Sequence, residues 1–231
     1  MLSADEWEVV RLSLKVSGAG VLAVLPLAFA LAFLLARGRF PGKLLLDALV
    51  HLPLVLPPVV TGWLLLLAFA PAAPAGAWLE RTVGLTLMFR WTGAALAAAV
   101  MALPLMVRAM RLSIEAVDRR LEGAARTLGA GRWRTFASIT LPLSAPGIAA
   151  GLVLGFARSI GEFGATITFV SNIPGETRTL PIAIYAALQV PGSDLAVARL
   201  AVIAVALSLG ALVASEWLSR RAGAGSGGHV L

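Results

Sequence analysis

The chain has 231 residues, of which 59% are apolar and 13% charged; soluble domains carry about 25% charged residues, so the composition indicates a membrane protein. With no cysteine and only two histidines, the chain lacks the residues for a disulfide scaffold or for a cysteine or histidine metal site. The formal net charge of +7 fits either a nucleic-acid-binding protein or a membrane protein with basic cytoplasmic loops, and the positions of the basic residues decide between them.

Five apolar stretches are long enough to cross a bilayer as helices. We expect transmembrane spans over residues 16–36, 44–70, 84–107, 145–169 and 195–218. The first stretch has no charge over 21 residues and would form a helix of about 31 Å, close to the roughly 30 Å of a hydrocarbon core. The acidic segment before it lacks the positive start of a secretory signal, so we expect a retained anchor. The shorter run 182–190 is predicted to be re-entrant or interfacial.

Prolines interrupt the second predicted span. Pro53, Pro57 and Pro58 remove backbone donors, which lipid-exposed helix tolerates poorly and a wall facing a cavity or another helix tolerates well. The pattern fits a broken helix beside a transport path and equally a kink used only for packing. Thr61 joins the prolines as a candidate path or gate residue. Near the start of this span, Asp47 and His51 are spaced for a pair, for which an interfacial hydrogen bond is the commoner explanation.

The segment 108–141 is polar enough to lie outside the membrane, yet it is amphipathic. A stripe of apolar residues recurs at helical spacing and predicts one helix: Ile114, Val117, Leu121, Ala124, Ala125 and Leu128. We expect the ion pairs Glu115–Arg119 and Glu122–Arg126 on its other face. Gly129 should end this helix, and a second short helix should end or kink near Pro142. The segment could be a solvated linker, but the stripe favours a surface for a partner protein.

The fourth predicted span carries Arg158 and Glu162, spaced to lie on one face of a helix. Mid-bilayer charges cost at least about 2.5–3.5 kcal/mol each, so we expect the two to pair and to face protein or water. The pair either borders an anion path or locks the helix to a neighbour; the second is slightly favoured because a neutralised arginine attracts an anion weakly. Thr166 is a further candidate path residue. The same span contains a repeat of small residues that predicts a packing seam: Gly147, Gly151 and Gly155.

The basic residues are unequally divided between the two sides of the membrane. Twelve of the 19 lysines and arginines fall after the first span, in the segment 108–141 and after the last span, against five on the opposite side. The positive-inside rule therefore predicts a cytoplasmic segment 108–141, a cytoplasmic C-terminus and an external N-terminus. This distribution explains the net charge without a nucleic-acid partner. The glycine-rich end, residues 222–231, is predicted to be a flexible tail.

The segment 108–141 resembles the EAA loop of ABC importer permeases, written E-A-A, three residues, G, nine residues, I-x-L-P. Glu122 lies one residue before the place of the family's acid, which Gly123 occupies. The candidate docking residues are Leu121, Glu122, Gly123, Ala124, Ala125, Arg126, Thr127, Leu128, Gly129, Ile139, Leu141 and Pro142. The resemblance implies that this loop docks into a separate ATPase subunit. No phosphate-binding loop motif occurs in the chain, so ATP and Mg²⁺ are expected on that partner, with no cofactor and no catalytic residue here.

Residues 40–43, 51–60, 161–169 and 172–181 resemble the molybdate and sulfate branch of this family. The resemblance implies an all-α, polytopic inner-membrane bundle of the type I importer class. It also implies a dimer of this subunit, two ATPase subunits and an external binding protein that delivers an oxyanion. Molybdate is the expected substrate, with sulfate or tungstate as alternatives, and alternating access is the expected mechanism.

Two functions of other classes are alternatives. An intramembrane enzyme using Glu162 and Arg158 would need polar groups at one depth on several spans, and only the fourth span shows such a cluster. A membrane interaction protein without transport would need neither the prolines of the second span nor the charges of the fourth. Both alternatives are weaker than a transport subunit.

Overall fold

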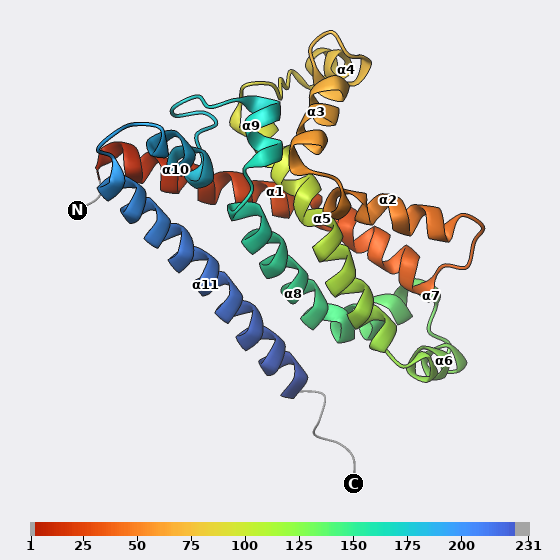
Figure 1. Cartoon of the computed structure of the whole chain (residues 1–231). Helices are drawn as coiled ribbons and strands as arrows, with labels where there is room; N and C mark the ends of the chain where they lie inside the picture. The colour runs from red at the N-terminus through yellow and green to blue at the C-terminus, as the bar shows by residue number, and fades with distance from the viewer. Residues whose placement is uncertain (1–2, 225–231) are drawn as a thin grey trace.

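The computed structural model describes residues 3–224, and this part of the chain contains helices and no strand (Figure 1). The helices are α1 (Ala4–Arg37), α2 (Lys43–Val55), α3 (Pro58–Phe69), α4 (Pro74–Val83), α5 (Trp91–Ala116), α6 (Arg119–Thr127), α7 (Arg132–Thr135), the π-helical turn η1 (Phe136–Thr140), α8 (Leu141–Ile160), α9 (Gly164–Val170), α10 (Leu180–Leu188) and α11 (Asp194–Ala224). Within the described residues, 4 helices are long and apolar enough to cross a membrane, or up to 5 spans if the bent pair α2–α3 counts as one. The expected all-α polytopic bundle is confirmed.

Helix α5 forms the centre of the bundle, with α1 and α8 packed along it and α11 outside α8 (Figure 1). In the apolar part of α5 about 67% of the residues are buried, compared with 6% in the apolar part of α11. Alanine makes this possible, because Ala94, Ala97 and Ala102 are fully buried and let neighbouring backbones approach. A Cβ atom added to Gly20 of α1 would lie 2.5 Å from the carbonyl oxygen of Ala95. The unburied face of α11 is apolar, as expected of a surface against lipid.

Two predicted spans have other bounds in the structure. The helix that contains residues 16–36 begins at Ala4, because Ser3 and Glu6 form a capping box that starts the helix earlier. The span expected over 84–107 is wrong at both ends, since its helix α5 runs from Trp91 to Ala116. Gly84, at φ 66°, ends α4, and the chain reaches Trp91 without a helix.

The second and fourth predicted spans are each broken. The range 44–70 forms α2 and α3, bent by 114° at Leu56 and Pro57, and the range 145–169 is divided between α8 and α9. Pro53 lies inside α2 without ending it, whereas Pro58 begins α3, where its missing N–H has no helical partner to lose. The second halves of the two broken spans, α3 and α9, pack against each other. The break expected from the prolines of the second span is therefore present, whereas the break in the fourth span was not expected.

The remaining segments follow the predictions more closely. The run 182–190 belongs mainly to α10, a 9-residue helix that is too short to cross and packs against α1 and α11. The Ser13 side chain of α1 accepts a hydrogen bond from the Leu180 backbone amide at 2.7 Å and so fixes the start of α10. Of the expected tail 222–231, residues 222–224 belong to α11, and the rest lies outside the described residues.

The predicted glycine seam of α8 packs against α5. Gly147, Gly151 and Gly155 are buried, and Cβ atoms added there would meet Ser113, Met110 and Met106. The three positions are unequal, because a Cβ atom at Gly147 would clash with Ser113 Cβ, which cannot move without the backbone, whereas the nearest atom to Gly151 is the flexible end of Met110 at 2.9 Å. Gly147 is therefore the position at which α8 and α5 have least room to adjust.

We expect Gly147→Ala to destabilise the folded protein by about 1–3 kcal/mol, the usual cost of overpacking. Gly151→Ala should cost less, since the Met110 side chain can move. Gly18→Ala is the matched control, because a Cβ atom there has no neighbour within 4 Å. The measurement is the midpoint of thermal unfolding in detergent, and equal midpoints for the Gly147 and Gly18 variants would contradict the seam.

Candidate functional site

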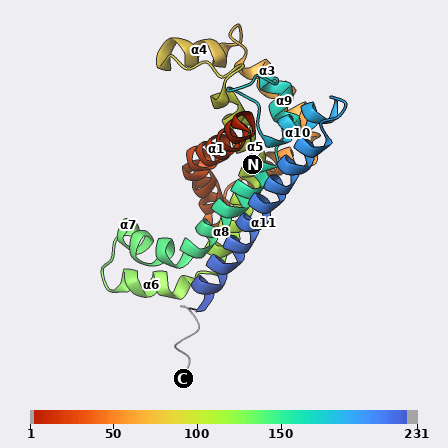
Figure 2. The same ribbon diagram turned by 90° about the vertical axis from the view of Figure 1, so that its left-hand side faces the viewer.

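The candidate docking loop is an arm that projects from the bundle. Helices α6 and α7 lie side by side and extend toward the same side of the molecule as α4, from the opposite end of the bundle (Figure 2). Helix α6 has no buried residue. Its N-cap is Asp118, whose carboxylate accepts a hydrogen bond from the Arg120 amide at 2.8 Å. This cap separates α6 from α5 and makes a short independent helix at the tip of the loop.

The single amphipathic helix predicted from residue 114 is therefore wrong. Helix α5 continues to Ala116, so Ile114 is a fully buried core residue of the bundle, and Val117 follows the end of that helix. The pattern of apolar residues runs through the break, because Ile114 and Val117 face the core while Leu121 and Leu128 face outward. Periodicity alone does not show where one helix stops and the next begins.

The predicted end of α6 at Gly129 agrees with the structure. Gly129 has φ 86°, and its amide donates to the Arg126 carbonyl oxygen at 3.0 Å. The Ala130 amide donates to the Ala125 carbonyl oxygen at the same distance, which completes a Schellman motif. The left-handed conformation at this position favours glycine, because a Cβ atom would clash with the following carbonyl.

Of the two outcomes expected near Pro142, an end or a kink, the helix does not end and instead changes its hydrogen-bond pattern directly before the proline. Residues Arg132–Ile160 form one apolar helical segment of 29 residues, with the π-helical turn η1 directly before Pro142. Leu141 donates its amide to the Phe136 carbonyl oxygen across this wider turn. In a regular helix the ring of Pro142 would clash with the preceding turn. The extra residue in the π-helical turn removes this clash, so the helix continues with a locally wider hydrogen-bond pattern.

The carboxylate of Glu122 faces inward, toward the bundle. It accepts hydrogen bonds from Arg37 Nη2 at 3.1 Å and from Thr140 Oγ1 at 2.8 Å. Arg37 Nη2 also donates to the Val117 carbonyl oxygen at 3.2 Å. These contacts tie α6 to the C-terminal end of α1 and to η1, and we call Glu122, Arg37 and Thr140 the clasp.

The two ion pairs predicted within the loop are wrong. Glu122 pairs with Arg37 and not with Arg126, and Glu115 pairs with Arg111 of the preceding turn at 2.8 Å. The break at Asp118 is the cause for Glu115, since it removes Arg119 from the helix face of that carboxylate. Arg37 was not among the expected site residues, although it is the first charge after the first span.

The outer surface of the arm is apolar and exposed. Leu128 is 89% exposed and Trp133 84%, values that a helix packed on the bundle would not show. Of the other expected docking residues, Leu121, Gly123, Ala124, Arg126, Thr127 and Gly129 are also exposed, whereas Ala125 is half-buried. Ile139 is half-buried in η1, and Leu141 and Pro142 are exposed at the start of α8. The expected docking set is thus divided between the arm and the helix behind it.

The candidate path residues lie where the two broken spans meet. Arg158, in the last turn of α8, pairs with Glu162 in the break, with Nη1 and Oε2 2.7 Å apart. The Glu162 side chain is only 2% exposed, and its Oε1 accepts a hydrogen bond from the Ala165 amide at 2.9 Å. The expected pair therefore exists, and it also caps the first turn of α9.

The break in the second span lies against the break in the fourth. A Cβ atom on Gly164 would be 2.8 Å from Pro58, and one on Gly62 would be 2.5 Å from the Ala165 carbonyl oxygen. Thr61 and Thr166 are both buried, on α3 and α9, and the Thr61 hydroxyl has no hydrogen-bond partner. Pro57 and Pro58 belong to this junction, whereas Pro53 lies earlier, inside α2. The structure thus brings together all the expected path candidates except Pro53.

Asp47 and His51 form the expected hydrogen bond, with His51 Nδ1 2.9 Å from the Asp47 carbonyl oxygen. A third residue was missed: Arg111 of α5 donates from Nη1 to both carboxylate oxygens of Asp47, at 3.1 Å each. The group joins α2 to α5. Among residues 3–224, no cluster of three or more His, Cys, Asp and Glu side chains is suited to hold a metal ion.

Comparison with known proteins places this geometry in a family. A family model described as the binding-protein-dependent transport system inner membrane component matches residues 25–223. The chain is 59% identical over 220 residues to the molybdenum transport system permease protein ModB of Escherichia coli K12, covering 95% of this chain and 96% of that one. The ModB protein of Haemophilus influenzae is 56% identical over 216 residues, 94% of each chain.

A solved structure shares the fold. The bacterial ABC transporter that imports the acidic polysaccharide alginate superimposes with a TM-score of 0.72 at 22% identity, over 95% of this chain and 80% of that one. At this identity the likeness concerns the arrangement of helices alone. The superposition covers 95% of this chain, so the likeness concerns the overall arrangement of helices and not one part of it.

Proposed function

Because the chain belongs to the family of binding-protein-dependent transport system inner membrane components, we propose that it is the membrane subunit of an ATP-driven molybdate importer. The observation that carries the proposal is the identity of 59% over nearly the full length of a molybdenum permease. As a permease of this family, the chain is a multi-pass protein of the bacterial inner membrane that transports and does not catalyse. ATPase and binding-protein partners follow from the family.

The arm is the docking site for the ATPase in this proposal. The exposed side chains of Leu128 and Trp133 offer an apolar surface, and an exposed apolar surface on a projecting amphipathic helix favours contact with a partner protein. The clasp prevents α6 from moving independently of α1. Any displacement that the ATPase imposes on α6 is therefore passed to α1 and η1, and through η1 to α8.

The movement reaches the candidate path through one helix. The segment Arg132–Ile160 connects the arm directly to the Arg158–Glu162 pair and the break before α9. When ATP binding brings the ATPase subunits together, this helix shifts α9 against α3, and the junction of the two broken spans opens to the outside. Hydrolysis restores the inward-facing state. Alternating access thus acts at the junction where Thr61 and Thr166 are buried.

We propose two copies of this chain, two ATPase subunits and one external binding protein in the assembly. The N-terminus lies outside and the C-terminus in the cytoplasm, which the excess of basic residues in 108–141 supports. The arm then lies on the side where ATP is available.

The substrate is tested by uptake of labelled molybdate into vesicles that contain the full complex with its binding protein. We expect ATP-dependent uptake of molybdate. Unlabelled tungstate should inhibit this uptake strongly, and sulfate should inhibit it weakly. Sulfate that competes as well as molybdate would favour the sulfate alternative. Absence of any ATP-dependent anion uptake by a correctly assembled complex would exclude the proposal.

The clasp is tested by a double-mutant cycle in the same complex. Glu122→Ala and Arg37→Ala should each reduce molybdate-stimulated ATP hydrolysis, because each removes a charged hydrogen bond worth about 1.5–3 kcal/mol and releases α6 from α1. The double variant should lose little more than either single one, since the two residues act together. Glu115→Ala is the matched control, because Glu115 pairs with Arg111 within α5. Additive losses, or an equal loss in the control, would contradict coupling through the clasp.

A further inference from the structure

A cavity of about 950 Å³ lies between the C-terminal end of α1 and the arm. Its size is within the range of roughly 300–1,000 Å³ typical of small-molecule sites. The cavity is on the side of the arm that faces α1, and it shares Trp133 with the proposed docking surface, which continues outward over Leu128. Among the lining residues, the transport mechanism proposed above uses Glu122 with its partners Arg37 and Thr140, and Trp133 for docking, and it gives no role to the phenylalanines or to Arg119 and Arg132.

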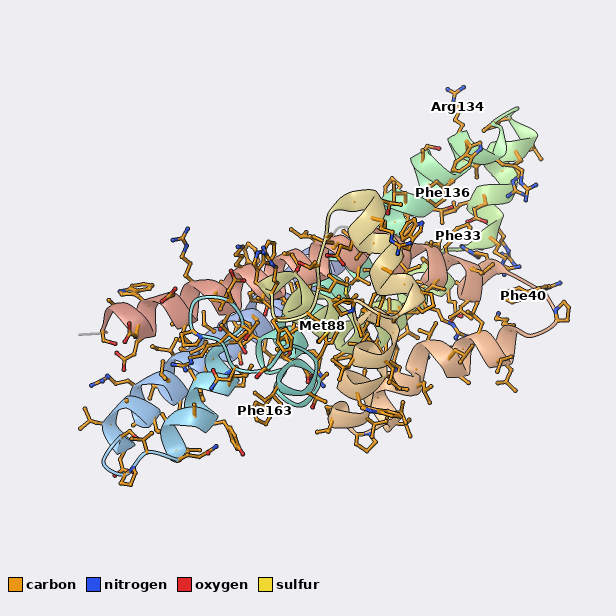
Figure 3. All side chains as sticks on the ribbon, turned by 90° about the horizontal axis from the view of Figure 1, so that it is seen from above. Phe33, Phe40, Met88, Arg134, Phe136 and Phe163 are labelled. Carbon is orange, nitrogen blue, oxygen red and sulfur yellow. The ribbon has the colours of Figure 1, made fainter. Side chains whose placement is uncertain are left out.

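One wall of the cavity is aromatic. Phe33 of α1 meets Phe136 of η1 edge to face, with ring centroids 5.4 Å apart, and Phe136 also contacts Phe29 and Trp133 at 6.0 and 6.2 Å. Figure 3 shows Phe136 directed toward Phe33, whereas Arg134 of α7 points away from the bundle. All four rings line the cavity. They form a continuous apolar surface between the arm and α1.

The other side of the cavity is basic. Arg119, Arg126 and Arg132 line it, and none of the three forms an ion pair with any residue of the described range 3–224. The one acid in the lining, Glu122, is already neutralised by Arg37. The cavity therefore presents uncompensated positive charge, which an anion would stabilise.

The wall also contains polar groups without partners. Thr135 lines the cavity and is only 2% exposed, and its Oγ1 has no hydrogen-bond partner. Arg37 also lines the cavity, and its buried Nε atom likewise has no hydrogen-bond partner. Buried polar groups in native proteins are usually satisfied by protein, water or ligand. Two such groups in one wall favour an occupant that offers hydrogen-bonding atoms.

The position of the cavity in the membrane identifies the chemistry of its occupant. The uncharged stretch of α1 ends at Ala36, so Arg37 marks the membrane surface, and Phe29 lies eight residues deeper, about 12 Å along the helix. Phe29 and Phe33 of α1 are thus at the depth of acyl chains, and the arginines are at the depth of headgroups. An amphiphile with an anionic head and an apolar chain matches both halves.

We propose that this cavity binds an anionic phospholipid, with its phosphate at Arg119, Arg126 and Arg132 and an acyl chain along the aromatic wall. An acidic segment of the ATPase would satisfy the arginines equally well. It would not account for Phe29 and Phe33, which lie at a depth that a soluble subunit does not enter. The inference does not depend on which anion is transported.

The test uses the full chain reconstituted in phosphatidylcholine nanodiscs that contain a trace of spin-labelled phosphatidylglycerol or spin-labelled phosphatidylcholine. Electron paramagnetic resonance gives the relative association of the two lipids with the protein. We expect a preference for phosphatidylglycerol that falls about fivefold for each cavity arginine removed in Arg119→Gln and Arg132→Gln. Arg134→Gln is the matched control, since it removes the same charge next to Arg132 but outside the cavity.

The wild-type comparison needs no variant and decides the first point, because equal association of the two lipids would overturn the proposal. An equal loss in Arg134→Gln would also overturn it, by showing general surface attraction. Displacement of the labelled lipid by inorganic phosphate would assign the site to a free anion.

If the double variant Arg119→Gln/Arg132→Gln keeps its lipid preference but fails to bind the ATPase, the arginines belong to the protein interface and the lipid site is excluded. Arg119→Lys and Arg132→Lys should retain the preference for phosphatidylglycerol, because lysine keeps the positive charge. A loss in the glutamine variants alone then results from the missing charge and not from misfolding.

Discussion

Gly129→Val is expected to reduce the stimulation of ATP hydrolysis by molybdate about tenfold or more in the assembled complex, because a β-branched residue in the left-handed conformation costs at least about 1–2 kcal/mol. Gly129 has φ 86° and ends α6 through the hydrogen bonds of the Schellman motif. Valine would break these bonds and displace Leu128, which is 89% exposed and borders the break. The surface offered to the ATPase would then be lost although the membrane bundle is intact.

Gly131→Val is the control for this prediction. Gly131 lies two residues away, at φ −66° and ψ 165°, a conformation that valine adopts freely, and a Cβ atom there has no neighbour within 4 Å. ATP hydrolysis is measured with and without loaded binding protein, and assembly is checked by size-exclusion chromatography. Normal stimulation in Gly129→Val would show that α6 does not couple the two subunits.

Arg158→Ala is expected to cause the largest loss of folded protein. It leaves the carboxylate of Glu162, only 2% exposed, without its partner at 2.7 Å. Breaking a buried pair in this way costs about 3–5 kcal/mol, a large part of the stability of a typical domain. The yield of monodisperse protein in detergent and the midpoint of thermal unfolding measure the effect. An unchanged midpoint would show that the pair contributes little to the stability of the folded protein.

The double variant Arg158→Met/Glu162→Gln separates stability from transport. It removes both charges, and glutamine can still accept the hydrogen bond from the Ala165 amide, so the yield should recover. If uptake also recovers, the pair only joins α8 to α9. If the protein folds but does not transport, the pair takes part in the path, and the two interpretations left open by the sequence are decided.

The features that could be predicted from the sequence are those fixed by neighbouring residues. Runs of apolar residues revealed the membrane spans, a spacing of four joined Arg158 to Glu162, and glycines at the same spacing marked the seam between α8 and α5. The end of α6 at Gly129 was likewise a local signal. In each of these features the signal comes from residues that are close together in the sequence, although the α5 side of the seam was not predicted.

The features that were missed depend on distant residues or on competition between signals. The partner of Glu122 is Arg37, which is 85 positions earlier in the chain, and no local pattern joins them. At Pro142, the sequence left open whether the helix ends or only kinks, and the structure has a wider turn that keeps the helix continuous. The capping box of Ser3 and Glu6 starts α1 twelve residues before the uncharged run at residue 16, because a helix can begin in a charged segment outside the apolar stretch.

The π-helical turn before Pro142 sets the angular relation between the arm and the bundle. One residue of an α-helix corresponds to a rotation of about 100°, so the additional residue within Phe136–Thr140 turns everything before it by that amount about the helix axis. This one additional residue therefore determines the direction in which Trp133 of α7 points relative to Arg158 of α8. Homologous chains that lost this residue would keep every helix, yet their arm would point in a direction rotated by about 100° about the axis of α8.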